Sequence, residues 1–337
     1  MKYSVGYQLR KSDDWINAIL ANKKHVEEVY YSWPGFPNGR GDTGRAVGFT
    51  PWEAQARIEK DLRKIAESGI NTNLLLNAMC YGAQSQARTL FMRIGETLDY
   101  SIHNFKTNSV TTTSPLIARF VHENFEGIEV RASINMEIGS TRSMETVVQY
   151  FDGFYMRREL NREPAIIEEL KKWCDQKGRK LHFLANSGCI ADCAMHVFHD
   201  NLVAHEQEIS ILDNAYDFRG VCWERLGNPA LRENYLASAT FVRPEDIIVF
   251  EQWFSVAKLA TRTNRDPVRV LNAYIRNSYS GSLPALMEPN HEHTFIPLLL
   301  ENTLLPTDFG RHVMECRKNC NECSYCKQAL SDALVRL

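Results

Sequence analysis

The chain has 337 residues, which suits one large barrel domain or two ordinary domains and allows a sizeable core. Its 39 Lys and Arg residues nearly balance its 41 Asp and Glu residues. The net charge of −2 therefore gives no electrostatic argument for nucleic acid or a membrane as the main partner. No apolar run has the length of a signal peptide or a transmembrane helix, so we expect a cytoplasmic protein.

Short runs of β-forming residues alternate with helical segments along most of the chain. The helical segment that begins at Thr50 has a good N-cap residue followed by Pro51, and another ends at Gly178, a typical helix stop. This alternation is typical of a parallel α/β fold, most economically a (β/α)₈ barrel of the TIM type. The predicted strands are Tyr3–Gln8, Glu27–Trp33, Asn71–Asn77, Ser109–Ser114, Ile128–Asn135, Gly153–Met156, Lys180–Asn186, Thr240–Arg243 and Val256–Thr261.

These nine runs are one too many for a barrel of eight strands. Either one run lies outside the barrel or the barrel is irregular. A doubly wound open sheet is the alternative, although no GxGxxG motif follows an early strand. Beyond residue 285 the sequence becomes rich in proline and then in cysteine. We therefore predict a barrel domain over residues 1–285 and a C-terminal extension over residues 286–337.

The most specific motif is CRKNCNECSYC, which places four cysteines in eleven residues with the spacing C-x₃-C-x₂-C-x₂-C. So tight a run can wrap around an iron–sulfur cubane and offer one sulfur to each iron. Structural zinc more often uses two separated CxxC pairs. We predict a metal site here, with an iron–sulfur cluster favoured, zinc as the alternative, and a free redox-active thiol set third. Its ligands are Cys316, Cys320, Cys323 and Cys326.

A second group of cysteines follows the predicted strand Lys180–Asn186, at the end of the strand that forms the active face of a barrel. Cys189 and Cys193 are four residues apart, and both face the strand ends if a helix begins near residue 190. Cys222 and Cys80 fall in or after other strand-to-loop regions and could complete a cofactor site of four cysteines. The alternative for Cys80 is a buried small hydrophobic residue.

Polar residues near these cysteines are candidates for catalysis. His196 and His199 lie on the same helical segment as Cys193 and could bind substrate or transfer protons. We interpret His205 as a residue that merely closes that helix. Arg243 ends a later predicted strand and could line the pocket. Arg262, at the exit of the last strand, could grip a substrate carboxylate or phosphate, although a surface salt bridge is the alternative.

From NSGCIADC, through Cys222, to FVRPEDIIVFEQ, KLATRT and YSGSL, the sequence resembles the collagenase-like peptidase family U-32 over Ile128 to about Leu283. The resemblance implies a barrel-like fold with clustered cysteines. Several members hold a [4Fe–4S] cluster and, with partners, hydroxylate ubiquinone precursors, tRNA or ribosomal RNA without oxygen; others carry a peptidase label. Cys189 and Cys193 match the C-x₃-C pair of the cluster-binding members, and Cys222 lies where another member cysteine would fall.

Two features depart from the family pattern. The family's Lys-Ile-x-Gly-Arg stretch reads KLATR here, without the glycine, and the terminal four-cysteine run is additional. The extra run suggests a second cluster and a separate subfamily, which leaves the substrate open.

These patterns favour an iron–sulfur redox enzyme that hydroxylates or oxidises a small, RNA-linked or peptide-linked substrate. It would use one or two [4Fe–4S] clusters, an electron donor protein or reductant, and a partner protein of the same family, and no membrane. The first alternative is a peptidase, although no HExxH, no GxSxG and no Cys–His pair in a nucleophile's context is apparent. The second is a non-catalytic iron–sulfur partner protein.

Overall fold

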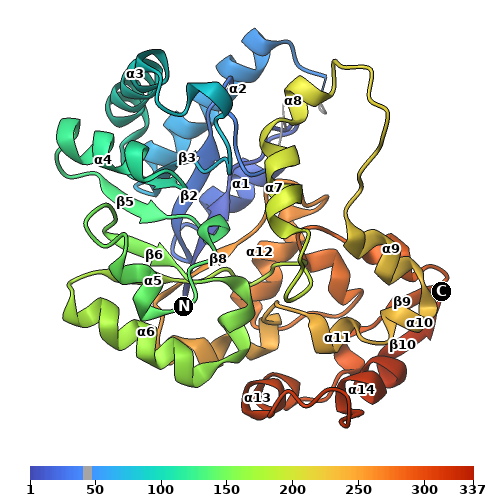
Figure 1. Cartoon of the computed structure of the whole chain (residues 1–337). Helices are drawn as coiled ribbons and strands as arrows, with labels where there is room; N and C mark the ends of the chain where they lie inside the picture. The colour runs from blue at the N-terminus through green and yellow to red at the C-terminus, as the bar shows by residue number, and fades with distance from the viewer. Residues whose placement is uncertain (41–47) are drawn as a thin grey trace.

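Eight parallel strands form the centre of the protein in its computed structural model, which describes residues 1–40 and 48–337. They are hydrogen-bonded in the order β7-β6-β5-β4-β3-β2-β1-β8, so the first seven are neighbours in chain order (Figure 1). Their bounds are β1 Lys2–Gly6, β2 Val26–Ser32, β3 Asn71–Leu76, β4 Thr107–Thr112, β5 Glu129–Ala132, β6 Gly153–Tyr155, β7 Lys180–His182 and β8 Val256–Leu259.

The sheet curls so that its two edges approach each other. Beyond the end of β7, Ala185 N–H donates to the Lys258 carbonyl of β8 at 2.9 Å, and Lys258 N–H donates to the Phe183 carbonyl at 3.2 Å. These bonds nearly close the ring, which confirms the predicted barrel. These bonds also pair the backbone of Lys258 and so reduce the exposed strand edge that an open sheet would have.

The surplus predicted strand is the run Thr240–Arg243, which forms no strand in the structure. Its Val242 N–H donates to the Ala185 carbonyl at 2.7 Å, so it runs as an irregular segment beside the chain that leaves β7. Phe241 and Val242 are buried there, which explains the apolar pattern that predicted a strand. Pro244 follows and opens a 3₁₀ helix over Pro244–Gln252.

Helices pack around the barrel and fill the connections between strands (Figure 1). The predicted start at Thr50 is correct, since Glu53 N–H donates to Thr50 Oγ1 at 3.3 Å and Thr50 N–H donates to the Glu53 carboxylate at 2.8 Å. The bounds are α1 Asp14–Ala21, α2 Pro51–Glu67, α3 Arg88–Phe105, α4 Pro115–Asn124, α5 Thr141–Glu145, α6 Pro164–Gln176, α7 His196–Ala204, α8 Glu206–Ile209, α9 Val221–Gly227, α10 Pro229–Arg232, α11 Tyr235–Ser238, α12 Pro267–Arg276, α13 Phe309–Glu315 and α14 Tyr325–Ala333.

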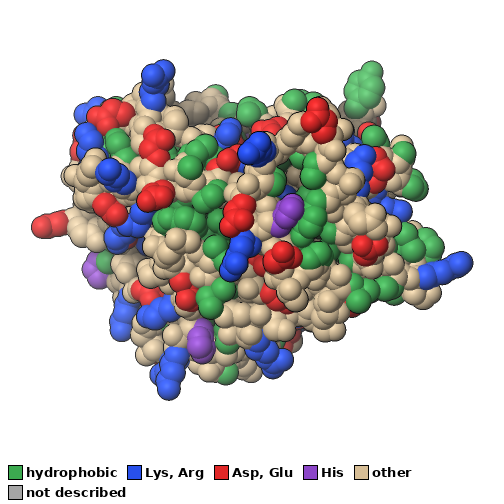
Figure 2. Space-filling view, turned by 90° about the horizontal axis from the view of Figure 1, so that it is seen from below, with side chains coloured by type: hydrophobic (Ala, Val, Ile, Leu, Met, Phe, Trp, Pro, Cys, Tyr) green, Lys and Arg blue, Asp and Glu red, His purple; other side chains and the backbone are tan. Residues whose placement is uncertain are grey.

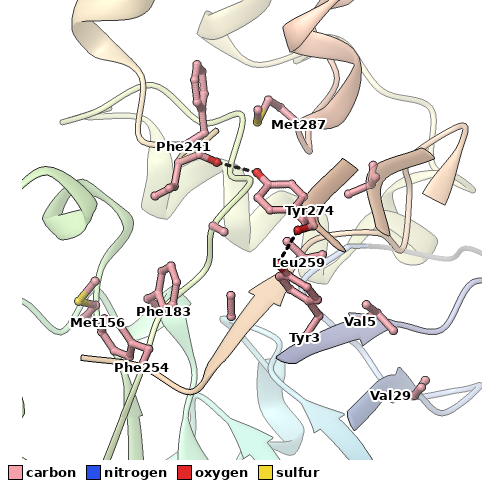
Figure 3. Close-up of a cluster of buried hydrophobic side chains, with 14 of the residues drawn as sticks. Tyr3, Val5, Val29, Met156, Phe183, Phe241, Phe254, Leu259, Tyr274 and Met287 are labelled. Atoms are coloured by element: carbon pink, nitrogen blue, oxygen red, sulfur yellow. Dashed lines mark hydrogen bonds between the residues drawn. The ribbon is translucent and has the colours of Figure 1, made fainter. Parts of the chain in front are cut away.

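The main core is one continuous cluster of apolar side chains between the barrel and its helices. Figure 3 shows part of it, where the Tyr3 hydroxyl donates to the Tyr274 carbonyl at 2.6 Å. The Tyr274 hydroxyl donates in turn to the Val242 carbonyl, also at 2.6 Å. Buried tyrosines thus keep their hydroxyl groups paired while their rings pack.

The C-terminal extension carries its own small sheet and two helices. Strands β9 (Leu298–Leu300) and β10 (Leu334–Arg336) pair antiparallel, and α13 and α14 lie beside each other at the edge of the molecule (Figure 1). Phe309 of α13 and Leu330 of α14 are buried in the main core. The extension therefore packs against the barrel and shares its core.

The surface offers no dominant field of one charge on the face shown in Figure 2, where acidic and basic side chains are interspersed. Within residues 1–40 and 48–337, none of the helices combines the length and apolarity that crossing a membrane requires. The mixed charges of that face agree with the balanced composition.

Candidate functional site

Three of the predicted cofactor cysteines meet at one cavity beyond the carboxyl end of β7. Cys189, Cys193 and Cys222 line this cavity, whose volume is about 220 Å³. We call it the three-thiol cavity. The prediction of a helix from residue 190 is wrong, because α7 begins only at His196 and both Cys189 and Cys193 lie in the preceding loop.

Close backbone packing fixes this loop. A Cβ atom on Gly188 would lie 2.1 Å from the carbonyl oxygen of Pro289, so only glycine fits there. The Thr240 hydroxyl donates to the Cys189 carbonyl at 2.9 Å. The run Thr240–Arg243 therefore helps to hold a thiol in place although it is no strand.

Charged residues surround the thiols. Arg40 and Glu288 both line the three-thiol cavity, and Arg40 Nε donates to Glu288 Oε1 at 2.8 Å. Burial and the neighbouring Cys189 and Cys193 raise the pKa of the Cys222 thiol to about 11. Cys222 is therefore a neutral thiol at pH 7 unless a cation binds beside it.

His196 and His199 also line this cavity, as the sequence predicted for a common site. Although burial opposes it, hydrogen bonds to Asp200 and Glu137 raise the pKa of His196 to about 9, so this imidazole is charged at pH 7. The His196 nitrogens lie 3.1 Å from Asp200 Oδ2 and 3.2 Å from Glu137 Oε1. By contrast, burial lowers the pKa of His199, which stays neutral.

The thiol set of this cavity provides three of the four ligands of an all-cysteine cluster. His199 lines the same wall and, as a neutral imidazole, has the chemistry of a fourth ligand. Among the described residues, no three Cys, His, Asp or Glu side chains are already gathered closely enough to hold a single metal ion. The argument that these residues could hold a cluster therefore depends on two facts: they line the same cavity, and thiols and a neutral imidazole are suitable ligands.

Cys80 is absent from the lining of the three-thiol cavity and lies against His205 instead. It follows β3 at the same end of the barrel. The Cys80 thiol and His205 are hydrogen-bond partners, and Gly82 N–H donates to Cys80 Sγ at 3.3 Å. His205 Nδ1 lies 2.8 Å from Glu208 Oε2 on its other side. The role of Cys80 as a cluster ligand thus receives no support from its contacts.

Cys80 and His205 shift each other's pKa in opposite directions. The hydrogen bond from His205 lowers the pKa of Cys80, and the hydrogen bond to Cys80 raises the pKa of His205. Both shifts favour transfer of the proton from sulfur to the ring. We call Cys80, His205 and Glu208 the thiol triad.

Two members of the thiol triad, His205 and Glu208, line a cavity of about 410 Å³, whereas Cys80 is not part of its lining. His205 lies between α7 and α8, Glu208 lies in α8, and Gly82 lines the cavity from the loop after β3. Leu90 and Arg93 of α3 form another part of the wall. We call it the triad cavity, and its volume is in the range of small-molecule and peptide-side-chain pockets.

The two predicted substrate arginines are engaged elsewhere. Arg243 is 2% exposed, and its guanidinium donates to Asp246 at 2.6 and 3.1 Å and to the Pro306 carbonyl at 3.2 Å. Arg262 donates to Ser32 Oγ at 2.7 Å. Neither residue lines the three-thiol cavity or the triad cavity. Arg243 therefore ties the extension to the barrel, and Arg262 braces the interior of the barrel.

The C-terminal cysteines surround a further cavity of about 220 Å³. Cys316 caps the end of α13, and Cys326 lies in the first turn of α14. Cys320 and Cys323 lie in the exposed loop between these helices. All four cysteines of the predicted metal site therefore line one cavity, and their role as ligands stays a prediction.

Three further residues line the three-thiol cavity or the triad cavity without having been predicted as site residues: Arg40, His205 and Glu208. The signal for the last two was present, since His205 and Glu208 are three residues apart and follow a helix at the active end of β7. The sequence could not show that His205 lies beside Cys80, because Cys80 belongs to a different strand-to-loop connection, the one after β3.

No protein-family model matches the chain. The uncharacterized protease MJ1657 of Methanocaldococcus jannaschii is 26% identical over 326 residues, which cover 93% of this chain and 91% of the relative. The solved structure of the U32 peptidase Mk0906 has a TM-score of 0.54 and 13% identity, and the match covers 77% of this chain and 93% of that one. These matches confirm the predicted resemblance to the U-32 family, and the second shows a shared fold.

Proposed function

Because the chain shares the fold of a U32 peptidase and is related over most of its length to a protein named as a protease, we propose that it is a peptidase-type hydrolase with Cys80 as its nucleophile. The single observation that carries the proposal is the thiol triad: Cys80 is hydrogen-bonded to His205, and His205 is hydrogen-bonded to Glu208. A nucleophile, a base and a group that orients the base are the parts that covalent hydrolysis requires.

The triad prepares its nucleophile before substrate arrives. The His205 ring and the N–H of Gly82 both stabilise a negative sulfur at Cys80. Glu208 fixes the ring from the other side and stabilises its positive charge. A thiolate is the reactive form of cysteine, so a lowered pKa of the Cys80 thiol increases the share of the attacking species.

Hydrolysis would proceed in two balanced steps. The Cys80 thiolate attacks the carbonyl carbon of an amide, and the C–N bond breaks as the His205 imidazolium gives its proton to the leaving amine. A thioester remains. Water then attacks the thioester while the neutral His205 takes its proton, which releases the carboxylic acid and restores the thiolate–imidazolium pair.

The triad cavity suggests the kind of substrate. Its wall includes the acidic side chains of Glu206 and Glu208 on one side and Arg93 on the other. Arg93 also donates to the Gly35 carbonyl at 2.8 Å, which holds the guanidinium at the rim. Such a polar wall fits a short peptide segment with its own amide groups better than an apolar ligand.

The test is hydrolysis of a mixed fluorogenic peptide library by the full chain, purified without oxygen. We expect Cys80→Ala and His205→Gln each to reduce the rate at least about 100-fold. Glu208→Gln should have a smaller effect, because Glu208 is exposed and acts through the ring. Cys193→Ser is the matched control, since its thiol lies on the other cavity. Equal rates for the Cys80→Ala variant and the parent would exclude Cys80 as the nucleophile.

A second candidate function is the iron–sulfur redox chemistry that the sequence favoured. The observation in its favour is the three-thiol cavity, where Cys189, Cys193 and Cys222 converge with Arg40. These thiols would hold a cluster, which would supply one-electron chemistry when bound. Arg40 would offset its negative charge, and the charged His196 would hold a proton at its ring nitrogen beside the site.

The variants Cys193→Ser and Cys80→Ala distinguish the two candidate functions, because each removes a thiol from a different site. Iron and sulfide that disappear in Cys193→Ser but persist in Cys80→Ala would support a cluster at the three-thiol cavity. An unchanged iron and sulfide content in Cys193→Ser would contradict it. Peptide hydrolysis that survives loss of this iron would assign the activity to the thiol triad alone.

A further inference from the structure

The strongest unexplained feature outside both cavities is a buried cation without an anion. Arg162 is 8% exposed and lies in a 3₁₀ helix over Arg158–Arg162. Its Nη1 donates to the Leu236 carbonyl at 2.7 Å. Its Nε and Nη2 atoms are buried and have no hydrogen-bond partner, and no carboxylate of residues 1–40 or 48–337 forms an ion pair with it.

A buried guanidinium in this state is costly, because it has lost its hydration without gaining a counter-ion. Arg162 lines a cavity of about 260 Å³ together with Cys316, Cys320 and Cys326. The carboxylate of Asp246, which could have served as a partner, is taken by Arg243 at 2.6 Å. The unmet positive charge of Arg162 therefore faces three of the four C-terminal thiols.

We propose that Cys316, Cys320, Cys323 and Cys326 bind an iron–sulfur cluster whose negative charge is compensated by the buried guanidinium of Arg162. Four thiolates around a cluster carry more negative charge than its irons neutralise, so the site acquires the anion that Arg162 lacks. This inference is independent of the hydrolysis proposed above.

The fold explains how one short segment can enclose a cluster. Cys316 and Cys326 are held by α13 and α14, whose contacts with the core fix the two ends of the loop. Cys320 and Cys323 lie between them in an exposed loop that can adjust around a cluster. Tyr325 stacks on His312 at a ring distance of 3.5 Å and closes one side of the same cavity.

A cluster fits these observations better than zinc. All four thiols come from one loop of eleven residues, whereas structural zinc sites usually join two separate CxxC pairs. Adjoining cavities of about 220 and 260 Å³ on this segment also leave room for more than one metal ion.

The first test is metal and sulfide analysis of the full chain purified without oxygen, with the Cys320→Ser/Cys323→Ser double variant beside it. Both residues are exposed, so this variant should fold normally. We expect iron and sulfide each to fall by about four atoms per chain in the double variant. Cys80→Ala, the variant that abolishes the proposed hydrolysis, should keep the full content. An unchanged content in the double variant, or zinc without sulfide lost from it, would overturn the proposal.

The second test addresses Arg162 itself. In Arg162→Gln we expect iron to be lost to a chelator roughly tenfold faster or more, since partners beside a metal site commonly contribute that much. The thermal midpoint of the metal-free variant should not fall, because it no longer buries an unpaired charge. Arg276→Gln, an exposed change of the same kind on α12, is the control. An equal rate of iron loss in Arg162→Gln and its parent would refute the role of Arg162.

Discussion

Two cysteines of this chain show how far the surroundings decide what a thiol can do. Cys174 is fully buried in α6, and burial raises the pKa of its thiol to about 12. The hydrogen bond to His205 instead lowers the pKa of Cys80. Cys174 is therefore an inert packing residue, as expected for a free cysteine in a helix that faces the core, whereas the lowered pKa of Cys80 favours its thiolate form.

His196 is a residue at which pH should change stability. Its pKa is raised to about 9 in the folded chain, against about 6.5 when unfolded. Its contribution should therefore be complete below pH ~6.5 and disappear as pH rises through ~9. The free energy of unfolding of His196→Gln, measured by urea at pH 6 and pH 9.5, should fall below the parent's by at most about 3 kcal/mol at pH 6. A deficit that is the same at both pH values would contradict the assigned ion pairs with Asp200 and Glu137.

At the scale of elements, α13 is joined to the barrel by close packing on one carboxylate. A Cβ atom on Gly310 would lie 2.2 Å from Asp246 Cγ, and Asp246 is the ion-pair partner of Arg243. The glycine therefore allows the backbone of α13 to approach a buried ion pair. This contact fixes the first turn of α13, and Cys316 follows the last turn of the same helix.

Gly310→Ala should loosen that contact. We expect it to destabilise the chain by about 1–3 kcal/mol, because Asp246 must move away from Arg243 to make room. Gly227→Ala is the matched control, since its Cβ atom would meet nothing within 4 Å at the end of α9. The measurement is the thermal midpoint of unfolding of both variants. An equal midpoint would show that the close contact between Gly310 and Asp246 does not hold α13 in place.

The sequence predicted correctly those elements that have strong local signals. It failed where contacts with distant parts of the chain determine the secondary structure. The first seven predicted runs and the run at β8 are strands, and the capping box at Thr50 starts α2. The run Thr240–Arg243 has the apolar pattern of a strand but pairs only at isolated positions beside Ala185. Likewise, α7 starts at His196, later than the cysteine spacing suggested, because Asp192 adopts a left-handed backbone with φ of 52°.

At the scale of the whole molecule, the barrel brings together loops that are far apart in the sequence. The thiol triad joins the connection after β3 to the one after β7, and Figure 1 shows α7 and α8 extending across from the latter. Strand periodicity predicted that both connections end on the same face. It could not predict that Cys80 would lie beside His205, because loops have no repeating pattern of polar and apolar residues from which their conformation follows.

One buried amide adds to the backbone hydrogen bonds that nearly close the barrel. Asn186 Nδ2 donates to the Ala260 and Leu286 carbonyls, both at 2.8 Å, and Ala260 N–H donates to Asn186 Oδ1 at 2.6 Å. Asn186 thus joins the chain beyond β7 to the chain beyond β8. Asn186→Ala should lower the free energy of unfolding by about 2–4 kcal/mol, since three buried polar groups lose their partner.

Asn124→Ala at the exposed end of α4 is the control for that change, because its side chain makes a single bond to the Phe120 carbonyl. Urea unfolding of both variants gives the comparison. If Asn186→Ala were no less stable than Asn124→Ala, the closure of the barrel would have to depend on other contacts.

The most direct test of the central claim is the rate at which iodoacetamide alkylates each cysteine of the metal-free full chain between pH 5 and pH 9, followed by mass spectrometry. The account predicts that Cys80 reacts first and at a lower pH than the exposed Cys320 and Cys323, and that His205→Gln removes this advantage. If Cys80 reacts no faster than those exposed thiols in the parent chain, its thiolate is not activated, and the proposed hydrolytic function is wrong.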